Sequence, residues 1–340
     1  MTAPDRASTS ATDVTPQIAA TVAICTANRV DLLAGTLAAL LPALDPRHSE
    51  IVVVDNGSSD DTPRLLVETA ASAAAGGRPP GFFRFVREER AGLSAARNRA
   101  VREASGELLL FLDDDALPQP GWLEAYLQAF RDPRVGAAGG PVEPLFDGAL
   151  PAWLDGRFLP YLSAWDRGRE VVPLFYNELP RGANMGFRRA TFAVYGDFLE
   201  QLGRKGASLR SCEEIEYCLR LERGGEEILY LPSAGVRHHV GTQRLSVAWM
   251  EARFAAQGFS EAILDWRHAG ARGLRAGLRR VARLDHDQAH DSDADVMAAC
   301  LRHTCRGYRR GAFYALFCVA RYQPPAGAGS VTLKPFTPAV

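Results

Sequence analysis

Short apolar runs that alternate with helix-like stretches constrain the fold of this chain more than any other feature. The runs are rich in Val, Ile, Leu and Phe, and they occupy residues 21–27, 51–54, 82–87 and 107–112. Helical patterns lie between them, over residues 32–44, 60–75 and 93–104. Buried strands that alternate with helices through short connections are typical of a mostly parallel sheet with helices on both faces. The sequence therefore predicts an α/β fold.

Composition excludes several classes of protein. Hydrophobic residues make up 47% of the 340 residues, which is enough for a large core, and the formal net charge of -1 argues against a general nucleic-acid-binding surface. No apolar run reaches the roughly 18 residues that a membrane-spanning helix needs. The six cysteines form no CxxC pair, so neither a zinc site nor a disulfide scaffold is predicted. Reduced thiols in a cytoplasmic protein are the simpler interpretation.

Three adjacent carboxylates, Asp113, Asp114 and Asp115, follow the apolar run that ends at Leu112. Adjacent carboxylates repel one another unless a cation neutralises them. Mg²⁺ and Mn²⁺ prefer oxygen ligands and often share them with phosphates. Because open parallel sheets bind ligands beyond the carboxyl ends of their strands, the triplet predicts a site for a divalent cation and a diphosphate. A solvated acidic turn is the alternative.

Asp55 and Arg97 are two further candidates for ligand contacts. Asp55 ends the run over 51–54, where its carboxylate could accept hydrogen bonds from a base or ribose, or cap its own turn. Arg97 lies on the apolar stripe of the helix predicted over 93–104, so its guanidinium should turn inward and require an anion. That anion could be a bound phosphate, or Asp55 or Asp113.

Glu213 and Glu214 open a helix predicted over residues 212–223, and a helix N-terminus stabilises ionised carboxylates. Glu214 shares the apolar face and should point inward, whereas Glu213 shares what the spacing predicts to be a wetter face with Glu216. An ionised carboxylate beside a hydroxyl can act as a general base. Simple charges at a helix start are the alternative.

His238 lies in a strand-like segment over residues 236–240, in which alternation turns it inward together with Val236 and Val240. A neutral imidazole in this position could bind a metal ion or a phosphate. A histidine satisfied within the core is the alternative.

Six segments, taken in chain order, resemble the family-two glycosyltransferases of the GT-A fold. They are residues 23–29 (AICTANR), 51–62 (IVVVDNGSSDDT), 92–98 (GLSAARN), 111–115 (FLDDD), 182–189 (GANMGFRR) and 212–221 (CEE followed by CLRL). Each motif is moderately specific, and their order over about residues 20–240 strengthens the resemblance. It implies an α/β GT-A fold: a Rossmann-like, mixed and mostly parallel sheet flanked by helices, with a C-terminal helical extension.

The resemblance also implies an inverting transfer of a sugar from a nucleoside-diphosphate sugar to an acceptor hydroxyl. The residues that it assigns to the donor are Thr26, Arg29, Asp55, Arg97, Asp113 and Asp114. It assigns a divalent cation, Mn²⁺ or Mg²⁺, to Asp115, with His238 nearby. Glu214 stands where the family usually has an Asp as general base, and Glu213 would help to bind the acceptor. Which of these two glutamates is the base stays open.

On this interpretation the chain divides into a disordered tail over 1–18, a catalytic domain over 19–243, a helical extension over 244–325 and a tail over 326–340. The catalytic domain would have a nucleotide-sugar half (19–140) and an acceptor half (141–243). The acceptor could be a small molecule, a glycan or a lipid-linked molecule.

Two other functions remain open. One is a nucleotidyltransferase that makes nucleotide sugars, which would need a glycine-rich phosphate loop that residues 25–29 lack. The other is a non-catalytic nucleotide-binding protein, against which the intact carboxylates argue.

The last hundred residues are basic, with 14 Arg or Lys against 8 Asp or Glu. The six arginines between Arg267 and Arg283 interleave with apolar residues, and no acidic residue separates them. This pattern predicts either an amphipathic helix on the inner face of a membrane or a solvated helix packed on the catalytic domain. A final buried helix over 311–321 could form a homodimer contact.

Overall fold

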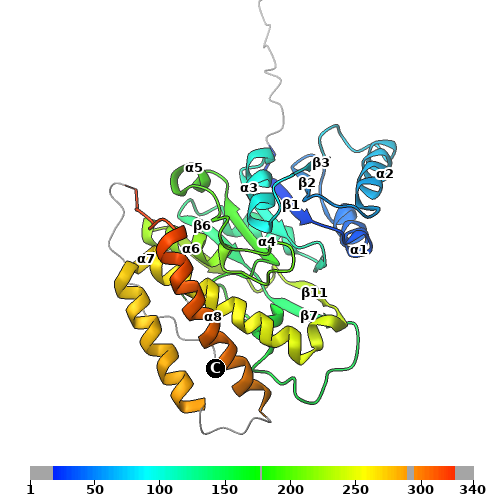
Figure 1. The fold of residues 1–340 in the computed structure, drawn as a ribbon. Helices are drawn as coiled ribbons and strands as arrows, with labels where there is room; N and C mark the ends of the chain where they lie inside the picture. The colour runs from blue at the N-terminus through cyan, green and yellow to red at the C-terminus, as the bar shows by residue number, and fades with distance from the viewer. Residues whose placement is uncertain (1–17, 177, 289–294, 326–340) are drawn as a thin grey trace, which may run out of the picture.

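The computed structural model describes residues 18–325, apart from residue 177 and residues 289–294. The predicted tails, up to residue 17 and from residue 326, lie outside the described residues. A large sheet runs through the molecule with the strand order β3-β2-β1-β4-β9-β6-β10-β8 (Figure 1). In that order its strands are Phe83–Arg87, Ser49–Asp55, Ala20–Thr26, Leu108–Leu112, Asn184–Arg188, Val135–Gly139, Glu227–Tyr230 and Val172–Pro173.

The first four strands of this order pair in parallel, as predicted. Every residue of β2 and β4 is buried, which explains the apolar runs over residues 51–54 and 108–112. The connecting helices are α1 (Val30–Leu40), α2 (Thr62–Ala75) and α3 (Leu93–Glu103), with a short 3₁₀ turn, η1 (Leu41–Ala43), after α1. The predicted strands and helices of this half are confirmed to within a few residues.

The second half of the chain turns the sheet into a mixed one. β9 is antiparallel to both β4 and β6, and β10 is parallel to β6. A separate three-stranded sheet has the order β5-β11-β7, with β5 at Ala116–Pro118, β11 at Val236–Val240 and β7 at Val142–Phe146. The remaining elements before residue 246 are α4 (Trp122–Ala129), η2 (Leu159–Leu162), α5 (Thr191–Tyr195), α6 (Glu213–Gly224) and η3 (Thr242–Leu245).

Two long helices, α7 (Val247–Gln288) and α8 (Val296–Cys318), pack along each other, across the molecule from α1 and α2 (Figure 1). Gly270 interrupts α7 with a positive φ of 59°. Two glycines of α8 let the helices approach closely, because a Cβ at Gly307 would lie 1.9 Å from the carbonyl oxygen of Ala255, and one at Gly311 would lie 2.4 Å from that of Phe259. None of the helices in the described part of the chain combines the length and apolar character needed to cross a bilayer.

Glu216 of α6 joins that helix to α7. Its carboxylate is fully buried and lies 2.9 Å from Arg220 Nη2, 2.5 Å from Arg267 Nε and 3.2 Å from His268 Nε2. Burial alone would raise the pKa of Glu216, but Arg220, His268 and Arg267 together lower it to about 2. This contact fixes the helix whose first turn carries Glu213 and Glu214.

We expect Glu216→Gln to lower the free energy of unfolding by about 3–5 kcal/mol, because Arg220 and Arg267 would stay buried without a counter-charge. Since folding lowers the pKa of Glu216, its contribution is present above the ordinary Glu pKa and is lost as the pH falls towards 2. Urea unfolding between pH 7 and pH 3 measures both effects. Glu89→Gln is the control, because this exposed carboxylate pairs with Arg87 at the surface. Equal losses in the two variants would contradict the account.

Candidate active site

The carboxyl ends of β1 and β4 bring Thr26, Arg29 and Asp114 together. Thr26 Oγ1 donates a hydrogen bond to Asp114 Oδ2 at 2.7 Å, and Arg29 Nη1 lies 2.9 Å from Asp114 Oδ1. The Thr36 hydroxyl of α1 donates to the backbone carbonyl of Asp114 at 2.9 Å. Asp114 therefore ties the turn after β1 to the end of β4, which fixes the carboxylates on either side of it.

Asp115 meets His238 because β11 pairs with β5. In that register His238 lies opposite Ala116, so His238 Nε2 comes within 3.1 Å of Asp115 Oδ1. Arg29 also contacts Asp115, and Arg244 Nη2 lies 3.3 Å from Asp115 Oδ2. Burial opposes ionisation of Asp115, but its cationic neighbours outweigh burial and lower its pKa. His238 is buried, as its strand alternation predicts.

One ligand atom from each of Asp113, Asp115 and His238 lies within 4.8 Å of the other two. Carboxylate oxygens with an imidazole nitrogen suit Mn²⁺ and related divalent ions. His238 Nδ1 is buried and has no hydrogen-bond partner among the described residues. These three residues could therefore hold a metal ion, with Asp113 as a member of the group.

A cavity is lined by residues that include Asp113 and His238. Asp55 does not line this cavity. Its carboxylate accepts a hydrogen bond from the Ser58 backbone N–H at 2.8 Å and lies 3.1 Å from Arg87 Nη1. The neighbouring Asn56 does line the cavity. Asp55 thus supports its own turn in this structure.

Arg97 turns inward as predicted and is 2% exposed, but its main partner differs from the expected ones. It contacts the Glu213 carboxylate, donates to the Gly182 carbonyl at 2.9 Å and lies 3.4 Å from Asp113 Oδ1. The prediction of a wetter face for Glu213 is wrong, because Glu213 and Glu216 are both buried. Arg97 of α3 contacts Glu213, and Arg267 and His268 of α7 contact Glu216, so both carboxylates are covered.

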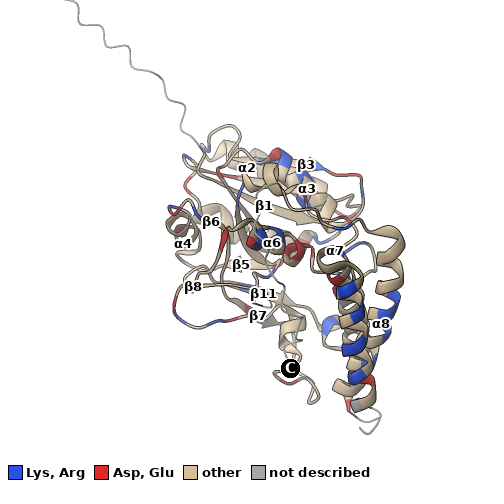
Figure 2. Cartoon of the chain, turned by 90° about the vertical axis from the view of Figure 1, so that its left-hand side faces the viewer, with Lys and Arg blue, Asp and Glu red and all other residues tan. Residues whose placement is uncertain are grey.

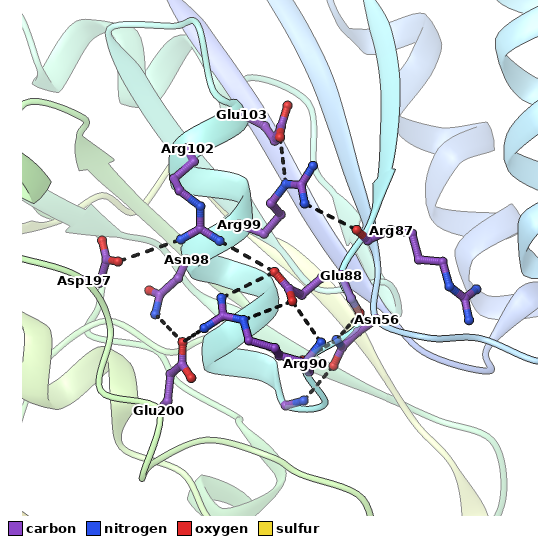
Figure 3. Close-up of polar contacts among 11 residues, drawn as sticks. Asn56, Arg87, Glu88, Arg90, Asn98, Arg99, Arg102, Glu103, Asp197 and Glu200 are labelled. Carbon is purple, nitrogen blue, oxygen red and sulfur yellow. Dashed lines mark hydrogen bonds and ion pairs between the residues drawn. The ribbon is translucent and has the colours of Figure 1, made fainter.

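A polar network holds the loop that leads into the helix of Arg97 (Figure 3). Asn56 Nδ2 donates to the carbonyls of Glu88 and Arg90, and its Oδ1 accepts from the Gly92 N–H at 2.8 Å. Arg90 Nη1 also lies 2.9 Å from Glu200 Oε1. Gly92 has a φ of 133°, which favours glycine, and α3 begins at the next residue.

Glu214 lines the cavity. Among the described residues, no nitrogen of a Lys, Arg or His side chain lies within ion-pair distance of the Glu214 carboxylate. Burial, and next the Glu213 carboxylate, raise the pKa of Glu214 to about 8. Cys212, immediately before this pair, has a left-handed backbone with φ of 75°, which is strained for a non-glycine residue. The two neighbouring glutamates therefore differ. Glu213 pairs with Arg97, whereas the raised pKa of Glu214 favours the uptake of a proton.

The cavity has a volume of about 670 Å³. All the predicted site residues except Asp55 and Asp115 line it. Arginines that the sequence does not single out also line it, namely Arg181, Arg204, Arg244 and Arg253, together with Tyr161. They come from separate segments, so no local spacing could have revealed them. Arg253 belongs to α7, so residues on both sides of the predicted boundary at 243 form one cavity.

Residues 21–199 match the family model described as glycosyl transferase family 2. The chain is 28% identical over 184 residues to a glucosyl-dolichyl phosphate glucuronosyltransferase of Haloferax volcanii, which covers 52% of this chain and 57% of that protein. It is 30% identical over 177 residues to a pre-mycofactocin glycosyltransferase of Mycobacterium tuberculosis, which covers 52% of this chain and 36% of that one. The chain thus spans only part of these relatives.

Solved structures resemble the chain in fold. A mannosyltransferase from Pyrobaculum calidifontis in complex with GDP-Man and Mn²⁺ aligns over 90% of both chains with a TM-score of 0.54 and 19% identity. GalNAc-T7 with UDP, GalNAc and Mn²⁺ aligns over 66% of this chain and 43% of that one, with a TM-score of 0.50 and 17% identity. The match over residues 21–199 shows that this chain belongs to glycosyl transferase family 2, and the mixed sheet and the likeness to these structures show the GT-A fold.

Proposed function

We propose that this glycosyltransferase moves a sugar from a nucleoside-diphosphate sugar to an acceptor hydroxyl with inversion, with Glu214 as the general base. The observation that carries the proposal is that one cavity contains Glu214, a carboxylate with no cationic partner in the described part of the chain, beside a group suited to a metal ion. The donor diphosphate would lie near Asp113, Arg29 and His238, and the acceptor would approach Glu214.

The chemistry then follows from the carboxylate roles. Glu214 would take the proton of the acceptor hydroxyl. At the same time the oxygen of that hydroxyl would attack the anomeric carbon from the side opposite the diphosphate. The new carbon–oxygen bond forms as the bond to the diphosphate breaks, and that electron pair leaves with the diphosphate. Glu213 would act as a positioning residue, because it holds Arg97 against Asp113.

Asp113, Asp115 and His238 fit a divalent cation, Mn²⁺ or Mg²⁺, by their donor atoms and by the buried His238 Nδ1, which has no hydrogen-bond partner among the described residues. When bound, such an ion supplies positive charge that stabilises the departing diphosphate. Arg29 and Arg244 would keep Asp115 ionised and oriented. The likeness to structures that contain Mn²⁺ and a nucleotide supports this assignment.

Family membership argues against the two alternatives considered for the sequence, a nucleotidyltransferase and a non-catalytic nucleotide-binding protein. The products also separate the three functions. A glycosyltransferase releases a nucleoside diphosphate, a nucleotidyltransferase releases pyrophosphate, and a binding protein releases neither.

A panel of nucleoside-diphosphate sugars with Mn²⁺ should yield nucleoside diphosphate from at least one donor, and EDTA should abolish that release. We expect Asp115→Asn to reduce the metal-dependent rate at least about 100-fold, since it removes a charged ligand. The control is Asp147→Asn, which removes the exposed partner of the neighbouring His239 and should leave the rate unchanged. Release that is insensitive to both EDTA and Asp115→Asn would contradict the metal assignment.

Glu214→Gln should lower kcat at least about 100-fold and leave the affinity for nucleoside diphosphate unchanged, because only proton transfer is lost. In the wild type, kcat/KM should rise with pH with an apparent pKa well above that of an ordinary glutamate and close to 8. The comparison variant, Glu213→Gln, should weaken donor binding as well, since it releases Arg97. A wild-type kcat/KM that is flat between pH 5 and pH 9, or full turnover in Glu214→Gln, would assign the base elsewhere.

We also propose that α8 contacts an anionic membrane surface through a basic–aromatic stripe. Its members follow helical spacing and are Arg306, Arg309, Arg310, Phe313, Leu316 and Phe317. Phe313 is 70% exposed and Phe317 74%, so the prediction of a buried final helix is wrong for this face. Figure 2 shows further basic positions along α7 and α8. A two-fold dimer through the stripe would bring like charges together, which favours a lipid surface over a second copy.

Flotation with vesicles tests the stripe. The chain should float with vesicles that contain phosphatidylserine at low salt and remain unbound with phosphatidylcholine alone. The double variant Phe313→Ala, Phe317→Ala should lose this binding, whereas Phe175→Ala, which removes an exposed ring outside α8, should retain it. Absence of wild-type flotation, or a homodimer in light scattering that the double variant abolishes, would overturn the proposal.

A further inference from the structure

Two arginines of the cavity, Arg181 and Arg253, have buried nitrogen atoms that find no hydrogen-bond partner within the described ranges of the chain. These atoms are Nε of Arg181 and both Nε and Nη1 of Arg253. Arg181 lies over the ring of Trp165 and Arg253 over the ring of Tyr161, each at 5.9 Å from the ring centroid. Ring contacts leave the N–H groups at the guanidinium edge unsatisfied.

Three other arginines that line the cavity are already paired with carboxylates. Arg29 pairs with Asp114 and Asp115, and Arg97 pairs with Glu213. Arg244 pairs with Asp115. Against this background, the unsatisfied atoms of Arg181 and Arg253 mark the part of the cavity wall that lacks an anion.

Arg181 and Arg253 line the same cavity, and Arg204 lines it as well. Burial is the largest influence on Arg181 and lowers its pKa. The attraction of Glu214 raises that pKa, and the repulsion of Arg253 lowers it. Arg204 experiences burial and repulsion from Arg253 and Arg244, which lower its pKa to about 9. Burying guanidinium groups beside one another without counter-ions is costly, so an anion at this wall would relieve both the desolvation and the repulsion.

The nearest carboxylates do not supply that anion. Burial raises the pKa of Glu214 to about 8 and that of Glu261 to about 7, so neither provides a full negative charge at neutral pH. Glu261 also accepts a hydrogen bond from Gln257 and pairs with Arg280.

We propose that Arg181 and Arg253 bind an anionic group, a phosphate ester or a carboxylate, that the acceptor carries near its reacting hydroxyl. The inference rests on the proposed function, because it identifies the acceptor side by the position of Glu214. The two arginines lie near Glu214 and Tyr161, whereas the residues suited to the metal and diphosphate lie at Asp113, Asp115 and His238. The rings of Tyr161 and Tyr176 line the same wall and offer an apolar surface beside the anion.

Phenyl phosphate and benzoate are suitable probes, because each combines an anion with a ring, and phenol is their neutral counterpart. Calorimetry would use the whole chain saturated with UDP or GDP and Mn²⁺, so that the donor site is filled. At least one anionic probe should bind at least about tenfold more tightly than phenol, as expected for charge-assisted hydrogen bonds. Binding of phenyl phosphate or of benzoate alone identifies which anion the wall accepts.

Arg181→Gln and Arg253→Gln should each weaken binding of the anionic probe at least about tenfold and leave nucleoside diphosphate affinity unchanged. Arg253→Lys keeps the charge and should retain part of the binding. The matched control, Arg272→Gln, changes an exposed arginine of α7 and should bind like the wild type.

Two results would overturn the inference: no preference for either anion over phenol in the wild type, or an equal loss of nucleoside diphosphate affinity in Arg181→Gln and Arg253→Gln. The second result would assign these arginines to the donor. Failure of the wild type to bind any nucleoside diphosphate, with anion binding intact, would instead count against the proposed function alone.

Discussion

Repulsion among the carboxylates at the end of β4 is the constraint on which the rest of the structure depends. Asp113, Asp114 and Asp115 are adjacent in the chain, and the last two are buried. Each needs positive charge or hydrogen bonds from elsewhere. The turn after β1 supplies Arg29, and the small second sheet supplies His238, with Arg244 just beyond it. The arrangement of the two sheets is therefore what makes this acidic cluster possible.

The first half of the fold could be predicted because its signals are local. Apolar runs determine the strands, and helical spacing correctly turns Arg97 inward. Strand alternation likewise predicts the burial of His238. Its contact with Asp115 could not be predicted from spacing, because it depends on the pairing of β11 with β5.

Predictions from the sequence fail at residues where segments that are distant along the chain pack together. Helical spacing places Glu213 on a wetter face, because spacing alone does not show that Arg97 of α3 packs on Glu213 and that α7 packs on Glu216. The sequence does not single out Arg181, Arg204 or Arg253, because they lie in different segments that meet only in the fold. The predicted C-terminal extension also takes part in the site, because residues of α7 line the cavity. α7 carries Arg253 and also contacts Glu216 through Arg267. The packing of the extension therefore affects the geometry of the site.

The central claim is that the carboxylates beyond β4 hold a divalent cation against a nucleoside diphosphate. Anomalous X-ray scattering from crystals soaked with Mn²⁺ and UDP or GDP tests it most directly. The account predicts a manganese peak bound by Asp113, Asp115 and His238, with the diphosphate in contact with the ion. A crystal with nucleotide bound but no manganese at these three residues would contradict it.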